Sequence, residues 1–136
     1  MKNENEEQKG KKMYGNTAYN IYTQNNVGIE SPEKLIEMMY EGVLRFNAQA
    51  KKAIKDKNLE KKVYWINRAT AVISELLANL DKTQEGDISL YLDGLYNYEI
   101  GLLLKASLDN DVTKIDEVNG VFKGLLEAWR ETTNVA

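Results

Sequence analysis

The chain reads SPEKLIEMMYEG from Ser31 to Gly42, and this stretch marks the start of a helix. Serine is a residue type that caps helices through its side-chain oxygen, so Ser31 fits the cap position. Pro32 suits the first helical position, because the N–H that it lacks would be unpaired there, and Glu33 places negative charge at the positive end of the helix dipole. The stretch therefore divides the chain into an N-terminal arm and a helical region.

Four long segments with helical periodicity follow, separated by short turn-like gaps. The expected helices span residues 32–56, 59–81, 88–110 and 112–131. Gaps this short do not let consecutive helices run parallel, so the expected fold is all-α: an antiparallel up-down-up-down four-helix bundle with an N-terminal arm. The expected domain organisation is a disordered tail over 1–12, an arm or cap over 13–30, the bundle over 31–131 and a C-terminal tail over 132–136.

Composition limits the chemistry that the chain can perform. It has 136 residues without a cysteine or a histidine, which removes structural zinc sites, thiol or imidazole nucleophiles and histidine phosphotransfer. The nine glycines are scattered and form no phosphate-binding loop. We therefore expect no enzymatic activity, no metal and no cofactor.

The charge argues against nucleic acid as a partner, and the apolar pattern argues against membrane insertion. The net charge is −3, whereas contacts to phosphate backbones need concentrated positive charge. Lysines surround the expected turn near residue 57, and we interpret them as a solvated helix end: Lys51, Lys52, Lys55, Lys57, Lys61 and Lys62. The longest strictly apolar run, Ile100–Leu104, is far too short to insert into a membrane, and the charged start of the chain does not resemble a secretory signal.

Each expected helix has an apolar face that repeats every three or four residues. In 32–56 this face is Leu35, Met39, Val43, Phe46, Ala50 and Ala53. In 59–81 it is Leu59, Val63, Ile66, Thr70, Ile73, Leu77 and Leu80. In 88–110 it is Ile88, Leu92, Leu95, Leu102 and Ala106, and in 112–131 it is Ile115, Val118, Phe122, Leu125 and Trp129.

The two central helices carry more apolar residues than these faces need. A bundle helix needs an apolar arc of about 100° or somewhat more, and both segments exceed it. We expect the surplus either to fill a tight core or to form a groove for another polypeptide segment. The residues expected to line a client-binding groove are Trp65, Ala69, Val72, Leu76, Tyr91, Tyr96 and Leu103.

The arm carries tyrosines that can cover such a groove: Tyr14, Tyr19 and Tyr22. Burying three tyrosines contributes at most on the order of 12 to 15 kcal/mol, and the aliphatic side chains of the arm add several more. Ordering about 17 backbone residues costs about 1 to 2 kcal/mol each, so the two contributions nearly cancel. The arm is therefore either an autoinhibitory lid that leaves when a ligand arrives or a permanent strap that completes the core.

Five ordered segments resemble the flagellar secretion chaperone family, often called FliS. They are residues 31–46, ISELL at 73–77 followed by LD at 80–81, EGDI at 85–88, LDGLYNY at 92–98 and LLEAWRE at 125–131. The resemblance covers about Tyr14 to Glu131 and implies a four-helix bundle in the bacterial cytoplasm. We expect a monomer rather than an obligate oligomer. The resemblance implies binding of the C-terminal segment of flagellin, which would prevent premature polymerisation and keep flagellin competent for type III flagellar export.

The resemblance also implies further contacts. The flagellar export apparatus or a co-chaperone is an expected additional partner, and Ala18 and Tyr19 are expected to cover part of the apolar surface when no client is bound. The alternative that the residues themselves leave open is a self-associating structural bundle or an adaptor that binds another helical partner.

Overall fold

The computed structural model describes residues 31–81 and 87–133, which form helices at all four expected places. The helices are α3 (Pro32–Lys55), α4 (Leu59–Ala78), α5 (Ile88–Asp109) and α6 (Val112–Thr133). Compared with the expected ranges, α4 ends three residues earlier and α6 continues two residues into the expected C-terminal tail. The expected tail 1–12 and arm 13–30 lie outside the described residues.

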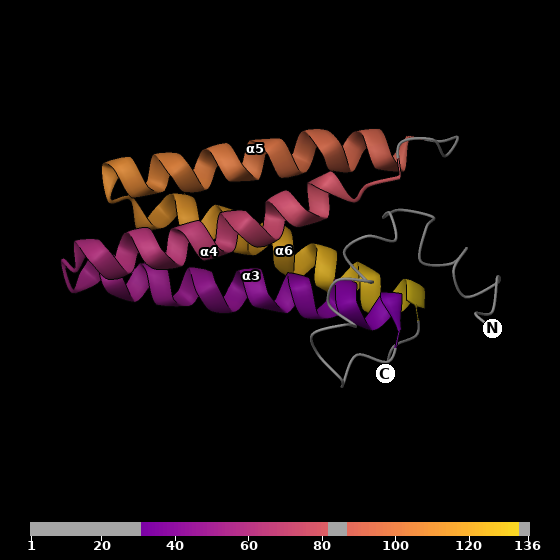
Figure 1. Ribbon diagram of the computed structural model, residues 1–136, viewed down its shortest axis with the longest axis horizontal. Coiled ribbons are helices and arrows are strands. Elements are labelled where there is room, and N and C mark those ends of the chain that lie inside the picture. Colours follow the sequence, from indigo (N-terminus) through magenta and orange to yellow (C-terminus); the bar gives the residue numbers. More distant parts are fainter. Residues whose placement is uncertain (1–30, 82–86, 134–136) are drawn as a thin grey trace.

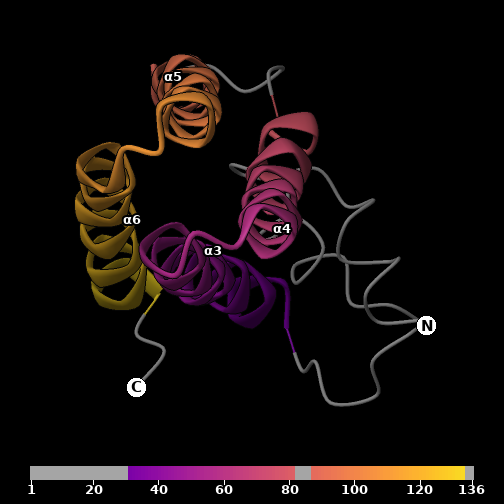
Figure 2. The same cartoon turned by 90° about the vertical axis from the view of Figure 1, so that its left-hand side faces the viewer.

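The helices pack side by side as a ring when the bundle is viewed from its end (Figure 2). In this ring α3 packs between α4 and α6, and α5 closes the opposite side between the same two helices. Consecutive helices run in opposite directions (Figure 1). The structure therefore confirms the all-α four-helix bundle.

Capping side chains fix where α3 and α4 begin. The hydroxyl oxygen of Ser31 accepts a hydrogen bond from the backbone N–H of Lys34 at 3.1 Å, as the sequence predicts. The side-chain oxygen of Asn58 accepts the equivalent bond from Lys61 at 3.1 Å. Each cap satisfies one of the backbone N–H groups that a helix leaves unpaired at its start.

The turn between α3 and α4 is a Schellman motif, a helix end closed by two reversed backbone hydrogen bonds. Asn58 N–H donates to the carbonyl of Ala53 at 2.9 Å, and Lys57 N–H donates to that of Ile54 at 3.1 Å. Lys57 has a φ of 56° and Asn110, which ends α5, has a φ of 53°. Both sharp turns thus place a non-glycine residue in the left-handed region at the same end of the bundle.

The core has an aromatic centre that links three helices. The hydroxyl groups of Tyr40 on α3 and Tyr96 on α5 share a buried hydrogen bond of 2.8 Å. Phe122 on α6 packs edge-on against Tyr40 and is stacked with Tyr96, with ring centroids 5.9 and 6.1 Å apart. These contacts join α3 to α5 across the middle of the ring.

The buried face predicted for α3 is confirmed, because all its members lie in the core. The face predicted for α4 is partly wrong. Leu59 is 66% exposed and Val63 is also exposed. The residues of α4 that are buried instead form a row shifted around the helix: Lys62, Ile66, Ala69, Ile73 and Leu76.

Polar contacts join α3 to α6. Arg130 donates to the carboxylate of Glu37 at 2.9 Å and to that of Glu41 at 3.0 Å. Burial by itself would raise the pKa of Glu37, but the hydrogen bonds from Arg130 and Lys34 outweigh it and leave the pKa below its usual value. Glu37 is therefore a buried, ionised carboxylate whose charge is neutralised by two cations.

Candidate functional site

The outward-facing side of α5 exposes large apolar side chains, which we call the α5 outer face. Its two most exposed members are Leu108, at 82%, and Leu90, at 75%. The set consists of Leu90, Tyr91, Tyr98, Leu104 and Leu108. Such a concentration on one helix differs from the isolated exposed apolar residues that any protein carries, and it makes this face a candidate interaction surface.

Charge is sparse on the exposed side of α5. Asp93 is partly exposed, and Lys105 is exposed between Leu104 and Leu108. Gly94 and Gly101 lie on the same side of the helix, and a Cβ added at either would meet nothing within 4 Å. The helix backbone is therefore open to close approach at these two positions, between the leucines and tyrosines.

On its inner side α5 buries a carboxyl group. Glu99 is only 2% exposed, and its Oε2 has no hydrogen-bond partner. Burial, with a smaller contribution from the charge of Glu117 on α6, raises the pKa of Glu99 to about 7. The helix thus exposes leucines and buries an acid, which is the reverse of what stability alone favours.

The residues predicted to line a groove fall into three groups. Tyr91 lies on the α5 outer face and is exposed. Trp65 and Val72 on α4 are partly buried and pack against the core. The remaining four lie inside the core: Ala69, Leu76, Tyr96 and Leu103. The arm residues Tyr14, Tyr19 and Tyr22 lie outside the described residues.

Trp65 is held at the contact between α3 and α4. Its ring is stacked with that of Phe46, with centroids 5.7 Å apart, and meets Tyr64 edge-on at 4.8 Å. The guanidinium of Arg68 lies over the Phe46 ring, 4.8 Å from its centroid. This arrangement lets Trp65 stabilise the helix pair while part of its ring stays accessible.

The sequence reasoning missed Leu90 and Leu108, the two most exposed members of the α5 outer face. The available signal was the composition of the helix. Because α5 is apolar on every side, periodicity does not show which side faces the core, but it does show that some apolar residues must remain outside.

Other kinds of site find little support in the part of the chain that the structure describes. Within 31–81 and 87–133 there is no cluster of three or more acidic side chains that could hold a metal ion. None of the described helices is both long and apolar enough to cross a bilayer.

Comparison with solved structures supports the fold. A solved structure described as "Crystal structure of flagellar chaperone from bacteria" is similar to the bundle with a TM-score of 0.72. It covers 88% of this chain and 98% of that one, at 19% sequence identity. The two chains thus share the same helical-bundle fold.

Sequence comparison then gives the family. A family model described as "Flagellar protein FliS" matches residues 15–136. The chain is 54% identical over 122 residues to the flagellar secretion chaperone FliS of Campylobacter jejuni, covering 90% of this chain and 95% of that protein. It is 32% identical over 126 residues to the protein of the same name in Salmonella typhimurium, with 88% and 92% covered.

The chain belongs to the FliS family of flagellar secretion chaperones. This confirms the resemblance found in the sequence. The relatives are named as chaperones, which is a non-enzymatic role.

Proposed function

We propose that this chaperone binds the disordered C-terminal segment of flagellin in the bacterial cytoplasm, prevents its premature polymerisation and keeps it competent for type III export. The observation that carries the proposal is the α5 outer face, which supplies uncovered apolar area on a rigid bundle. A segment that must not assemble early can fold against such a face and leave it again, because ordering the segment consumes much of the binding free energy.

The α5 outer face suits an amphipathic helical segment. Its leucines and tyrosines follow helical spacing along most of α5, and the two glycines between them admit close approach of a second backbone. An incoming helix with apolar residues at intervals of three and four would match this row. We propose that Tyr91, with Leu90 and Leu108, contacts the client.

A role for the other predicted residues follows from their positions. Trp65 and Val72 are partly accessible on α4. We therefore propose that a client that wraps around the bundle contacts them in addition to the α5 outer face. Ala69, Leu76, Tyr96 and Leu103 support the surface from inside the core, and direct contact with a client would require α4 and α5 to separate.

The test is calorimetric titration of the full chain with the C-terminal peptide of its own flagellin. Leu90→Ser and Leu108→Ser should each weaken binding about 10- to 100-fold, because burying a leucine contributes about 1.5 to 3 kcal/mol. Met38→Ser is the matched control, since Met38 is also exposed but lies on α3. Unchanged affinity in both α5 variants would refute the assignment of the face.

The arm is tested in the same titration. We propose that residues 13–30 act as an autoinhibitory lid through Tyr14, Tyr19 and Tyr22, so deleting residues 1–29 should raise the affinity for the peptide. An unchanged or weaker affinity in a still-folded deletion variant would favour a permanent strap.

The same apolar face also supports self-association as a second candidate function. Sedimentation of the full chain at micromolar concentration without client distinguishes the two, because a stable dimer that Leu90→Ser dissolves would favour a self-associating bundle. A monomer that binds the peptide supports the chaperone.

A further inference from the structure

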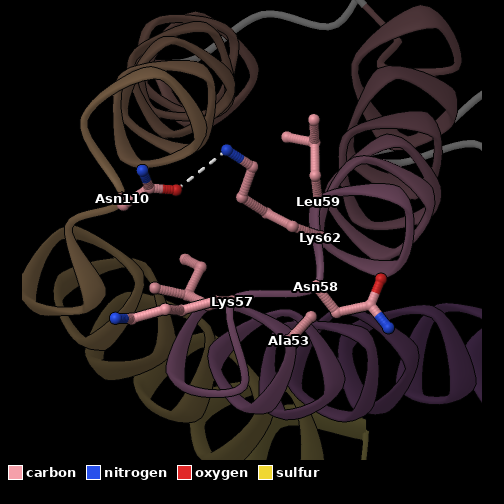
Figure 3. Close-up of a pocket in the computed structure, with 7 residues that line it drawn as sticks. Ala53, Lys57, Asn58, Leu59, Lys62 and Asn110 are labelled. Atoms are coloured by element: carbon pink, nitrogen blue, oxygen red, sulfur yellow. Dashed lines mark hydrogen bonds between the residues drawn. The ribbon is translucent and has the colours of Figure 1, made fainter.

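A pocket of about 390 Å³ lies at the end of the bundle where the α3–α4 turn faces the end of α5 (Figure 3). It is lined by Ala53, Ile54, Lys57, Asn58, Leu59, Lys62 and Asn110. None of these residues belongs to the α5 outer face. The volume falls within the range of small-ligand sites, roughly 300 to 1,000 Å³.

One part of the pocket is apolar. Ala53 and Ile54 lie in the last turn of α3, and Leu59 is the first residue of α4. The side chain of Leu59 remains 66% exposed although it borders the pocket. Its apolar surface is therefore available to a ligand that enters from solvent.

The other part of the pocket holds a buried ammonium group. Lys62 is only 7% exposed and extends toward the end of α5 (Figure 3). Its Nζ donates to the carbonyl of Ser107 and to the side-chain oxygen of Asn110, both at 2.8 Å. The third donor of the ammonium has no partner among these bonds.

Lys62 lacks a counter-charge. Both acceptors are neutral, and none of the ion pairs found among residues 31–81 and 87–133 includes Lys62. The carbonyl end of α5 offers only partial negative charge. Buried charges in proteins are normally paired with an opposite charge, so an anion at this position would complete the site.

We propose that this pocket binds a small carboxylate that carries an aliphatic chain. The carboxylate accepts the remaining N–H of Lys62, and the chain lies against Ile54 and Leu59. Lys57, in the turn at the rim, adds a second positive charge. A free carboxylic acid and the C-terminal carboxylate of a peptide that ends in an aliphatic residue share this chemistry.

Nuclear magnetic resonance titration of the full chain with hexanoate tests the proposal, with hexanol and acetate as matched probes. Hexanoate should shift the amide signals of Leu59 and Asn110 in a saturable way, at least tenfold more tightly than either control. A short peptide ending in leucine, compared with its C-terminal amide, separates the two sources: binding of the acid form alone supports a peptide terminus, whereas binding of hexanoate alone supports a free acid.

Two variants decide the role of each part of the pocket. Lys62→Met should remove the preference for hexanoate over hexanol. Leu59→Asp, at an exposed position that the fold tolerates, should abolish hexanoate binding, while Leu90→Asp on the α5 outer face should leave it unchanged. Equal binding of hexanoate and hexanol by the unaltered chain, or unchanged hexanoate binding in Leu59→Asp, overturns the proposal even where Lys62→Met does not fold.

Discussion

Replacing Glu99 with glutamine should stabilise the bundle at neutral and alkaline pH. The folded state raises the pKa of Glu99 from 4.5 to about 7, chiefly by burial. Between these two values the folded chain keeps a proton that the unfolded chain has released. Stability conferred by the protonated acid is therefore complete below pH 4.5 and falls by about 1.4 kcal/mol per pH unit until pH reaches about 7.

The total effect is on the order of 3 kcal/mol, from a shift of about 2.5 pH units. Urea unfolding followed by circular dichroism at pH 5, 6, 7 and 8 measures it. The unaltered chain should lose stability across this series, whereas Glu99→Gln should stay nearly flat. Glu37 does not interfere, because its lowered pKa places its titration below pH 4.5.

Glu117→Gln is the matched control for this prediction. Glu117 is exposed on α6 and adds a smaller charge repulsion to the burial of Glu99. Its replacement should reduce the pH dependence slightly and keep its sign. If the unaltered chain were equally stable at pH 5 and pH 8, or if Glu99→Gln kept the full slope, Glu99 would not be the buried acid that the structure describes.

Three further substitutions have measurable consequences. Arg130→Met should lower the free energy of unfolding in urea at pH 7 by about 1 to 3 kcal/mol, because Glu37 loses a hydrogen-bond partner. This loss should shrink as pH falls through the lowered pKa of Glu37. A loss that is independent of pH would contradict the pairing. Trp129→Ala should cost about 3 kcal/mol, and Trp129→Phe about 1 kcal/mol for the lost 2.8 Å bond to the carbonyl of Glu33. Unchanged stability in Trp129→Phe would mean that this bond contributes nothing. Lys57→Gly should raise the melting temperature by relieving a left-handed φ, which costs about 1 to 2 kcal/mol, against the smaller entropic cost of glycine; a lower melting temperature would show that the turn is unstrained.

Helix positions and the buried face of α3 followed from the sequence because independent signals agreed. The serine cap, the proline at the first helical position and a strongly one-sided apolar pattern all place α3 in the same way. The short turns then determine the antiparallel order, since they leave no length for a crossover.

The orientation of α4 did not follow from its periodicity. Lys62 occupies a core-facing position, and a lysine there hides the true row from any count of apolar residues. Only the structure shows that the ammonium reaches the end of α5, a contact between residues far apart in the chain. Conversely, Leu59 and Val63 extend the apolar pattern but are exposed at the start of the helix.

The presence of surplus apolar surface could be predicted from the sequence, but the residues that form it could not. Surplus apolar area on the central helices was visible in the sequence, but Tyr96 and Leu103 proved to be core while Leu90 and Leu108 proved to be surface. Helical spacing alone does not distinguish these alternatives, because both sides of α5 carry similar residues.

A helix with apolar residues on every side gains little hydrophobic free energy from one orientation about its own axis over another. For α5 that orientation depends on a few polar contacts, namely the hydroxyl pair Tyr96–Tyr40, the bond from Ser89 to the carbonyl of Asp81, and the Lys62 ammonium at its far end. The set of leucines that α5 exposes therefore depends on a few buried hydroxyl and amine groups. Replacing them would let α5 turn about its axis within the bundle and change which of its side chains are exposed.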